Sequence, residues 1–260
     1  MRIASIEDGL EQAFWKHVDK DPLDYYFFIL DWKSRRDQTK IWVATEDEQI
    51  HGLMLVYRDY VVQLRGNHEA VRLLLDHLPD LKESEFNVPL ECEDIMTAKF
   101  VPQLRQEMML MCLKKGEENI QITTAPVKLG PEDADEISAL MREADPDWWG
   151  EMSGDRLKAA MTPDAYWLGI RQNEQIVSVG QTRFVDFGSN VGVAATRKDY
   201  RNRGYATSIV SALVREILSR SPTALIHVIR NNAPAVRAYS KVGFKPYKTY
   251  LSFRACKQRS

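Results

Sequence analysis

The sequence predicts an α/β (α+β) fold arranged as two domains. Stretches typical of strands alternate with helical stretches in the second half of the chain. Turn-forming and polar residues gather in "KKGEENIQITTAPVKLGPED", which covers residues 114–133. Strand-turn-strand patterns occur on both sides of this segment. We therefore place a linker here and expect domains at residues 1–119 and 120–260.

The two halves resemble each other. "WVATEDEQIHGLMLVY" begins at Trp42 and "WLGIRQNEQIVSVGQTRF" begins at Trp167, and each reads as a strand, a polar turn and a strand. Near the end of each half, "FVPQLRQEMMLMCL" begins at Phe100 and "FKPYKTYLSFRAC" at Phe244. We expect a common architecture, although hairpins with polar turns also look alike by chance.

Composition excludes several classes of protein. A net charge of −2 argues against a dedicated nucleic-acid binder. Cys92, Cys112 and Cys256 lack the spacing of a zinc site or a disulfide framework. The first residues lack the apolar block of a signal peptide, and no apolar run is long enough to span a membrane. We expect a cytoplasmic protein without metal, nucleic-acid or membrane partners, and the oligomeric state stays open.

The second half yields its elements in order. Residues 131–144 predict a helix with Pro131 in its first turn, followed by a loop, "DPDWWGEM", and a short helix capped by Ser153 or Asp155. Strands are expected at 166–171, 175–185 and "NVGVAAT". The remaining expected elements are a helix from 205 with one apolar face, the strand "ALIHVI", the helix "APAVRAYSKV" and the strand "KTYLSF".

The stretch "YRNRGYAT", residues 200–207, predicts an anion site. It lies between an expected strand and a helix N-terminus, where free N–H groups and the helix dipole favour negative charge. Gly204 and Ala206 allow close approach of a ligand, and Arg201 and Arg203 can bind phosphate oxygens. The alternative is an ordinary strand–helix turn with solvent-facing arginines.

A second stretch, "VIRNNAPAVRAYSKVGF", follows about thirty residues later. Together the two resemble the signature sequences of the GNAT superfamily of acetyl-coenzyme A-dependent N-acetyltransferases. The matching residues are Arg201, Gly204 and Ala206 in the pyrophosphate signature, and Asn232, Ala235, Tyr239, Gly243 and Phe244 in the later one. The resemblance covers roughly residues 120–260 and implies two tandem GNAT-like domains, each a mixed sheet flanked by helices, with the coenzyme signature only in the second.

The resemblance also implies roles for individual residues. Backbone groups of the splayed strand "VGVAAT" would hold the acetyl carbonyl and the pantetheine arm. Asn232 would face the coenzyme or cap the following helix, and Tyr239 would protonate the leaving thiolate or simply pack. Asn202 departs from the family, which often has glycine or an apolar residue there. The expected coenzyme-binding residues are Val193, Ala195, Arg201, Asn202, Arg203, Gly204, Tyr205, Ala206, Asn232 and Tyr239.

The implied reaction is direct transfer of an acetyl group from acetyl-CoA to the primary amine of a small molecule or amino acid. A carboxylate must remove the proton of the ammonium form. The candidates are Glu143, Asp145, Asp147 and Glu151. We favour Glu151, because the neighbouring Trp148 and Trp149 would shield it and raise its pKa. The two tryptophans would also bind the acceptor, unless they fill the core.

The first half lacks a second phosphate signature. After "YVVQLRG" the chain continues with "NHEAVRLLLDHL", which has no pair of arginines around a glycine. We expect a degenerate copy that stabilises the second half and walls part of the acceptor cleft. This layout looks like the glycine N-acyltransferase-like branch. The alternatives are a noncatalytic acyl-CoA sensor, a longer-chain N-acyltransferase and a protein or peptide N-terminal acetyltransferase.

Overall fold

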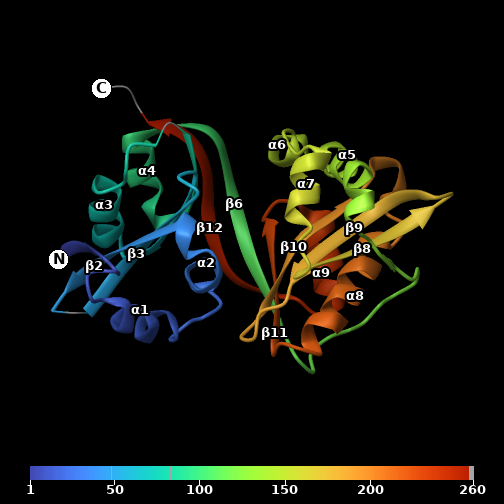
Figure 1. The fold of residues 1–260 in the computed structure, drawn as a ribbon, viewed down its shortest axis with the longest axis horizontal. Helices are drawn as coiled ribbons and strands as arrows, with labels where there is room; N and C mark the ends of the chain where they lie inside the picture. Colours follow the sequence, from blue (N-terminus) through green and yellow to red (C-terminus); the bar gives the residue numbers. More distant parts are fainter. Residues whose placement is uncertain (48, 82, 258–260) are drawn as a thin grey trace. The chain divides into compact units, whose positions relative to one another are not determined.

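The computed structural model describes residues 1–47, 49–81 and 83–257, with side chains for all of these except residues 256 and 257. Cys256, named above for its spacing, therefore has no described side chain. The chain forms two compact units, coloured along the sequence in Figure 1. Unit 1 comprises residues 1–109, 229–231 and 248–260, and unit 2 comprises residues 110–228 and 232–247.

Unit 1 is a mixed sheet with helices. Its strands follow the order β1-β2-β3-β4-β5-β12-β6, with β4 and β5 parallel. The elements are β1 (Arg2–Ser5), α1 (Glu11–Val18), α2 (Tyr26–Ser34), β2 (Thr39–Glu46), β3 (Gln49–Tyr57), β4 (Val61–Gly66), α3 (His68–Asp76), β5 (Glu83–Pro89), α4 (Glu93–Lys99), β6 (Phe100–Lys114) and β12 (Lys245–Lys257). The antiparallel pairing of β12 with β5 brings the end of the chain into this sheet.

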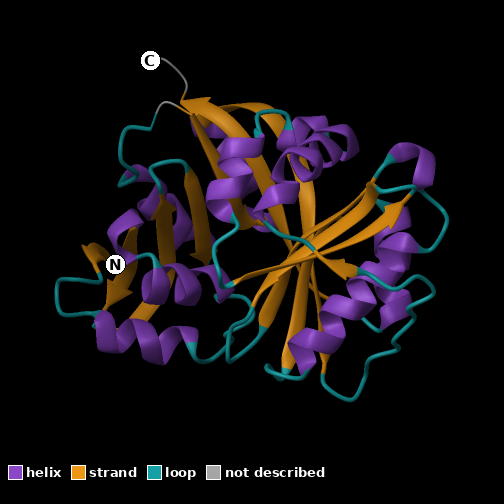
Figure 2. Ribbon diagram, turned by 45° about the vertical axis from the view of Figure 1, so that its right-hand side comes forward, coloured by secondary structure: helices purple, strands orange, loops and turns teal. Residues whose placement is uncertain are grey.

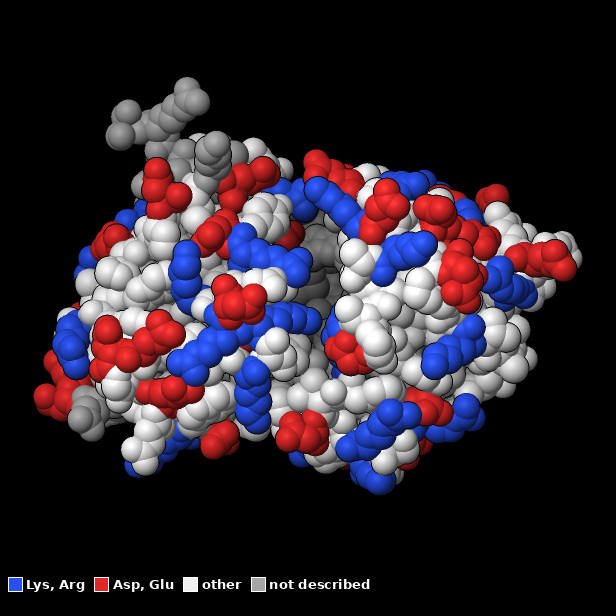
Figure 3. Space-filling view, viewed as in Figure 1, with Lys and Arg blue, Asp and Glu red and all other residues white. Residues whose placement is uncertain are grey.

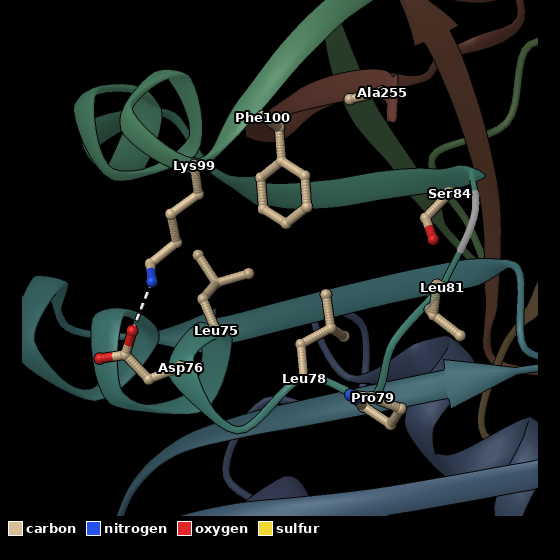
Figure 4. Close-up of a pocket in the computed structure, with 9 residues that line it drawn as sticks. All are labelled: Leu75, Asp76, Leu78, Pro79, Leu81, Ser84, Lys99, Phe100 and Ala255. Carbon is tan, nitrogen blue, oxygen red and sulfur yellow. Dashed lines mark hydrogen bonds and ion pairs between the residues drawn. The ribbon is translucent and has the colours of Figure 1, made fainter. Parts of the chain in front are cut away.

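The core of unit 1 forms between α3, α4 and the sheet. Val71 and Leu74 of α3 pack with Phe86 of β5 and with Leu251 and Phe253 of β12, all of them fully or almost fully buried. A cavity of about 200 Å³ lies beside this core (Figure 4). Leu75, Leu78 and Phe100 are among its lining residues, and an ion pair between Lys99 and Asp76 lies at one side of it.

Unit 2 has the strand order β6-β11-β10-β9-β8-β7, in which β10 and β11 are parallel. Its elements are β7 (Val127–Lys128), α5 (Ala134–Ala144), α6 (Pro146–Trp149), α7 (Gly154–Ala160), β8 (Ala165–Gln172), β9 (Gln175–Arg183), β10 (Ser189–Thr196), α8 (Tyr205–Leu218), β11 (Thr223–Ile229) and α9 (Ala233–Val242). Figure 2 separates the helices from the strands by colour.

The two main helices of unit 2 pack against the strands β9 and β10. Ile137 and Leu140 of α5 join a core with Trp167 and Val179. On α8, Ile209, Leu213 and Ile217 are fully buried, as expected from a stripe of apolar residues at helical spacing. Gly180 of β9 lets this helix approach, since a side chain there would meet Ile209.

The internal repeat is confirmed by the order of the elements. Each half runs strand, helices, three strands, helix, strand, helix, strand, beginning with β1 in the first half and β7 in the second. Gln49 and Ile50 of the first "EQI" stretch lie in β3, and the hairpin β8–β9 contains the second stretch. The expected α/β fold, a mixed sheet flanked by helices, is therefore confirmed, and the strands of both halves belong to one 12-stranded sheet.

Two short helices follow α5, and the sequence predicts one of them. The helix after Met152 is capped as expected, because Ser153 Oγ accepts a hydrogen bond from the N–H of Arg156 at 3.2 Å. The expected loop "DPDWWGEM" is wrong in part, because Pro146–Trp149 forms the short helix α6. Asp145 caps this helix by accepting a hydrogen bond from the N–H of Trp148 at 3.1 Å. Asp followed by Pro is a typical start of a helix.

The compact units do not follow a single cut at residue 119, because residues 248–257 of β12 complete unit 1. The division of the sequence into domains at 1–119 and 120–260 stays a prediction.

On the face drawn in Figure 3, basic and acidic side chains are interspersed over both units.

Candidate active site

A cavity of about 540 Å³ in unit 2 brings together most of the expected site. It is bounded by the end of β10, the loop before α8, the first residues of α8, the helix α9 and the junction of α5 with α6. The lining residues are Ala144, Asp145, Trp149, Ala194, Ala195, Thr196, Tyr200, Arg201, Asn202, Gly204, Tyr205, Ala206, Thr207, Asn232, Pro234, Ala235, Arg237, Ala238, Tyr239 and Lys241.

The strand β10 separates from its neighbour halfway along. It pairs with β11 only from Ser189 to Val191, whereas its pairing with β9 continues to Thr196. A β-bulge at Gly192 marks the change. The second half of β10 therefore has one edge without a partner strand in the described ladder, and this edge opens the cavity.

Strand alternation indicates which backbone groups face the open edge. The N–H of Arg197 donates to Val177 O of β9, so alternate residues, including Ala195, also face β9. The N–H groups of Ala194 and Thr196 then face the open edge. Ala195 lines the cavity as expected, while Val193 is not among the lining residues and packs against the α5 core.

The N-terminus of α8 opens onto the cavity. Gly204 has a φ of 81°, a left-handed conformation that suits glycine, and it stands at the N-cap position. Tyr205, Ala206 and Thr207 follow as the first helical residues, whose N–H groups have no partner inside the helix. Asn202 has a φ of 63°, and asparagine tolerates this conformation better than most residues. The departure from the family at Asn202 is therefore compatible with the loop.

The two arginines of the loop help to hold its shape. Arg201 Nε donates to Thr196 O and Arg201 Nη2 donates to Ala144 O, both at 3.2 Å. Arg203 Nη2 donates to Asp199 O at 3.0 Å, and its guanidinium lies 5.0 Å from the centroid of the Tyr200 ring. Both side chains are exposed, and Arg201 lines the cavity while Arg203 does not.

The helix α9 contributes Asn232 and Tyr239. Asn232 caps the helix, since its Oδ1 accepts a hydrogen bond from the N–H of Ala235 at 3.3 Å, and it also lines the cavity. Both roles expected for Asn232 are thus compatible with its position. Tyr239 is 6% exposed, and burial raises its pKa to about 12. Its hydroxyl therefore remains protonated at neutral pH and can act as a proton donor.

The four candidate carboxylates lie in different surroundings. Glu143 Oε2 pairs with Arg197 Nη1 at 2.8 Å, and its Oε1 accepts a hydrogen bond from the N–H of Lys198 at 2.9 Å. The hydrogen bond from Lys198, together with the charge of Arg197, lowers the pKa of Glu143. Asp145 is the one carboxylate among the described residues that line the cavity. Asp147 and Glu151 are not lining residues.

The expected shielding of Glu151 is wrong. Its side chain is 94% exposed and lies 3.8 Å from Arg156 Nη1, so the neighbouring tryptophans do not bury it. Trp148 and Trp149 are both half-buried and meet edge to face, with ring centroids 6.4 Å apart. Trp149 lines the cavity and also packs against the α5 core, whereas Trp148 is not among the lining residues.

Several lining residues escaped the sequence analysis. Arg237 and Lys241 lie one helical turn apart on α9 and both face the cavity. Their spacing from Pro234 was the available signal, since residues 234, 237, 238 and 241 share one side of a helix. The roles of Ala194 and Thr196 could not be predicted from the sequence, because they depend on which edge of β10 lacks a partner strand.

The described residues contain no cluster of three or more His, Cys, Asp or Glu side chains suited to a metal ion. Within the same residues, no helix has the length and apolar character needed to cross a membrane.

Comparisons with known proteins agree with this geometry. Residues 167–252 match the family model of FR47-like proteins. No curated protein matches the sequence. Among solved structures, a Drosophila protein has a TM-score of 0.71 at 12% identity, covering 97% of this chain and 98% of its own. A GNAT-family acetyltransferase from Colwellia psychrerythraea has a TM-score of 0.60 at 13% identity, covering 98% and 100%.

A tandem GNAT protein from the clavulanic acid biosynthesis pathway has a TM-score of 0.55 at 13% identity, covering 85% of this chain and 84% of its own. At these identities the likeness to the solved structures shows a shared fold. The resemblance to the GNAT superfamily is confirmed at the level of the fold: this chain shares the fold of these GNAT structures, including a tandem one, and its residues 167–252 match the FR47-like family model.

Proposed function

We propose that this chain transfers an acetyl group from acetyl-CoA to the primary amine of a small molecule or amino acid. One observation carries the proposal. The free N–H groups of Tyr205, Ala206 and Thr207 open onto the same cavity as the unpaired edge of β10 and the buried Tyr239. An anion site, a carbonyl-binding edge and a proton donor are what acyl transfer from a coenzyme A thioester needs.

The residues present fit the coenzyme. Gly204 and Ala206 leave the start of α8 open to a pyrophosphate, and the helix dipole favours its charge. When bound, acetyl-CoA supplies an activated acyl carbonyl. The N–H groups of Ala194 and Thr196 face the open edge of β10 and are suited to polarise that carbonyl.

Two side chains carry the proton transfers in this proposal. Asp145, at the junction of α5 and α6, accepts the proton of the ammonium form of the acceptor, directly or through water. Tyr239 donates its proton to the leaving sulfur. Trp149, which also lines the cavity, provides an apolar or cation–π surface for the amine.

A cytoplasmic location of the protein remains a prediction.

The proposal is tested by calorimetric titration of the full chain with acetyl-CoA, followed by assays for thiol release with a library of amines. The variant Ala206→Glu places a carboxylate and extra bulk where the pyrophosphate would bind. Acidic residues are favourable in the first turn of a helix, so the fold should persist. We expect binding to weaken by about 100-fold or more, which corresponds to about 2.7 kcal/mol.

Gln175→Glu adds the same charge at the exposed first residue of β9, outside the cavity, and serves as the control. Equal binding by Ala206→Glu and the parent would refute the phosphate site. Tight binding without turnover on any amine would instead indicate a coenzyme sensor. Faster turnover with longer acyl donors would indicate a longer-chain N-acyltransferase.

A further inference from the structure

We propose that Arg237 and Lys241 bind the 3′-phosphate of coenzyme A, so that this chain discriminates 3′-phosphorylated donors from dephosphorylated ones. The inference rests on the proposed function, because it concerns the nucleotide end of the same cavity. It assigns a role to two side chains that the pyrophosphate site and the chemistry of transfer do not use.

Three cationic residues line the cavity, and two of them, Arg237 and Lys241, have side chains that bind no other group of the described protein. Arg201, the third cationic lining residue, donates to two backbone carbonyl oxygens. Within the described part of the chain, the side chains of Arg237 and Lys241 take part in no hydrogen bond, ion pair or ring contact. Both are exposed at the cavity wall and retain their full capacity for donation.

The acidic groups next to the end of α9 are already engaged. Glu117, whose carbonyl oxygen lies against Gly243, has its carboxylate 2.8 Å from Lys245 Nζ. Glu118 Oε2 accepts a hydrogen bond from the N–H of Gly116 at 2.6 Å. Asp145 belongs to the α5–α6 wall and caps α6. These carboxylates therefore leave the positive charge of Arg237 and Lys241 available to a ligand.

The two cations line the same cavity as the proposed pyrophosphate site. One segment connects the end of α9 with the start of α8: Asn119 Nδ2 donates to Lys241 O at 3.0 Å, and Thr123 Oγ1 lies 3.1 Å from Ser208 Oγ. Thr123 also lies beside Gly204. The cations and the helix N-terminus are thus separate anion-binding elements on one cavity.

The chemistry of the donor selects the 3′-phosphate. The pyrophosphate oxygens are matched by the N–H groups of α8 and carry about one charge per phosphorus. The 3′-phosphate is a monoester, which carries close to two negative charges at neutral pH. An arginine and a lysine four residues apart on one helical face present two positive charges to such a group.

The test compares acetyl-CoA with acetyl-dephospho-CoA, which lacks only the 3′-phosphate, by calorimetry on the full chain. We expect the parent to bind acetyl-dephospho-CoA about tenfold or more weakly, as befits two charge-assisted hydrogen-bond donors. The double variant Arg237→Ala/Lys241→Ala should lose about the same factor with acetyl-CoA and bind acetyl-dephospho-CoA like the parent. The parent's preference should shrink as salt is added.

The matched control is Lys158→Ala/Arg215→Ala, which removes two exposed charges of unit 2 outside the cavity and should keep the preference. The charge-conserving variant Arg237→Lys/Lys241→Arg should keep most of the preference for acetyl-CoA that the double alanine variant loses. Equal affinity of the parent for both donors would overturn the inference while leaving the proposed function intact. An equal loss for both donors in the double variant would also overturn it. Failure of the parent to bind either donor would overturn both proposals.

Discussion

Asp145 caps the helix α6 and is also the proposed general base, and substitution by asparagine can separate these two roles. One carboxylate oxygen accepts the hydrogen bond that caps α6, and the residue also lines the cavity. Asparagine is as good an N-cap as aspartate but cannot act as a base at neutral pH. The substitution therefore tests catalysis without removing the cap.

We predict that Asp145→Asn lowers kcat/KM by about 100-fold or more, the usual contribution of a general base. The thermal midpoint and the affinity for acetyl-CoA should change little, as measured by calorimetry. Glu151→Gln is the matched control, because Glu151 is exposed and is not a lining residue. If Glu151→Gln were the impaired variant and Asp145→Asn active, the assignment of the base would be reversed.

The pH profile of the same variants separates the base from the acid. Tyr239 must be protonated to act, and its pKa of about 12 keeps it so until the pH approaches that value. An activity loss on the alkaline side below about pH 11 would therefore arise from another group.

At the scale of elements, Glu143 ties the end of α5 to the loop that precedes α8. Its carboxylate binds Arg197 and the backbone N–H of Lys198, two residues that directly follow β10. The hydrogen bond from Lys198 is the main reason why its pKa is lowered. Glu143 therefore stays ionised at neutral pH and acts in positioning the loop.

We predict that Glu143→Gln lowers the free energy of unfolding by about 1 kcal/mol at neutral pH, because the Glu143 carboxylate is partly exposed and solvent screens its charged hydrogen bonds. Because the folded-state pKa lies below the unfolded value, this stabilisation is complete above the unfolded pKa. It is lost as the pH falls through the folded pKa. Denaturant titrations should show the two proteins converging in acid. Glu132→Gln, an exposed control, should match the parent at every pH, and a difference that persists in acid would contradict this account.

The helices and hairpins were predictable, but their partners were not. Ile209, Leu213 and Ile217 recur at helical spacing, which predicted the helix α8, and the structure buries all three. The sequence contains no comparable signal for strand order, so the insertion of β12 beside β5 required the structure. For the site, Gly204 and Tyr239 were found through their motifs. The choice between Asp145 and Glu151 depended on exposure, which the short helix α6 sets.

At the scale of the whole molecule, the two halves share an element order but differ at one junction. Eight residues, 197–204, connect β10 to α8, whereas Asn67 alone connects β4 to α3. The first half has therefore no loop to surround a phosphate. In addition, Arg65 of β4, which is 4% exposed, donates to Asn87 O of β5 at 3.3 Å and to Asp24 at 2.6 Å. Its side chain bridges β4 and β5, the strands of the first half that correspond to the separating strands β10 and β11.

This difference predicts one coenzyme site per chain. Calorimetry of the full chain with acetyl-CoA should give a stoichiometry near one, and Ala206→Glu should remove the entire signal, because the remaining helix start at His68 follows β4 too closely and Arg65 spans the neighbouring strands. Two sites per chain, or a residual site of full amplitude in Ala206→Glu, would mean that the first half binds the donor independently. A duplicated fold keeps its packing when the connecting loop shortens, but an anion site does not survive that change, because it consists of the loop and the free N–H groups that the loop leaves open.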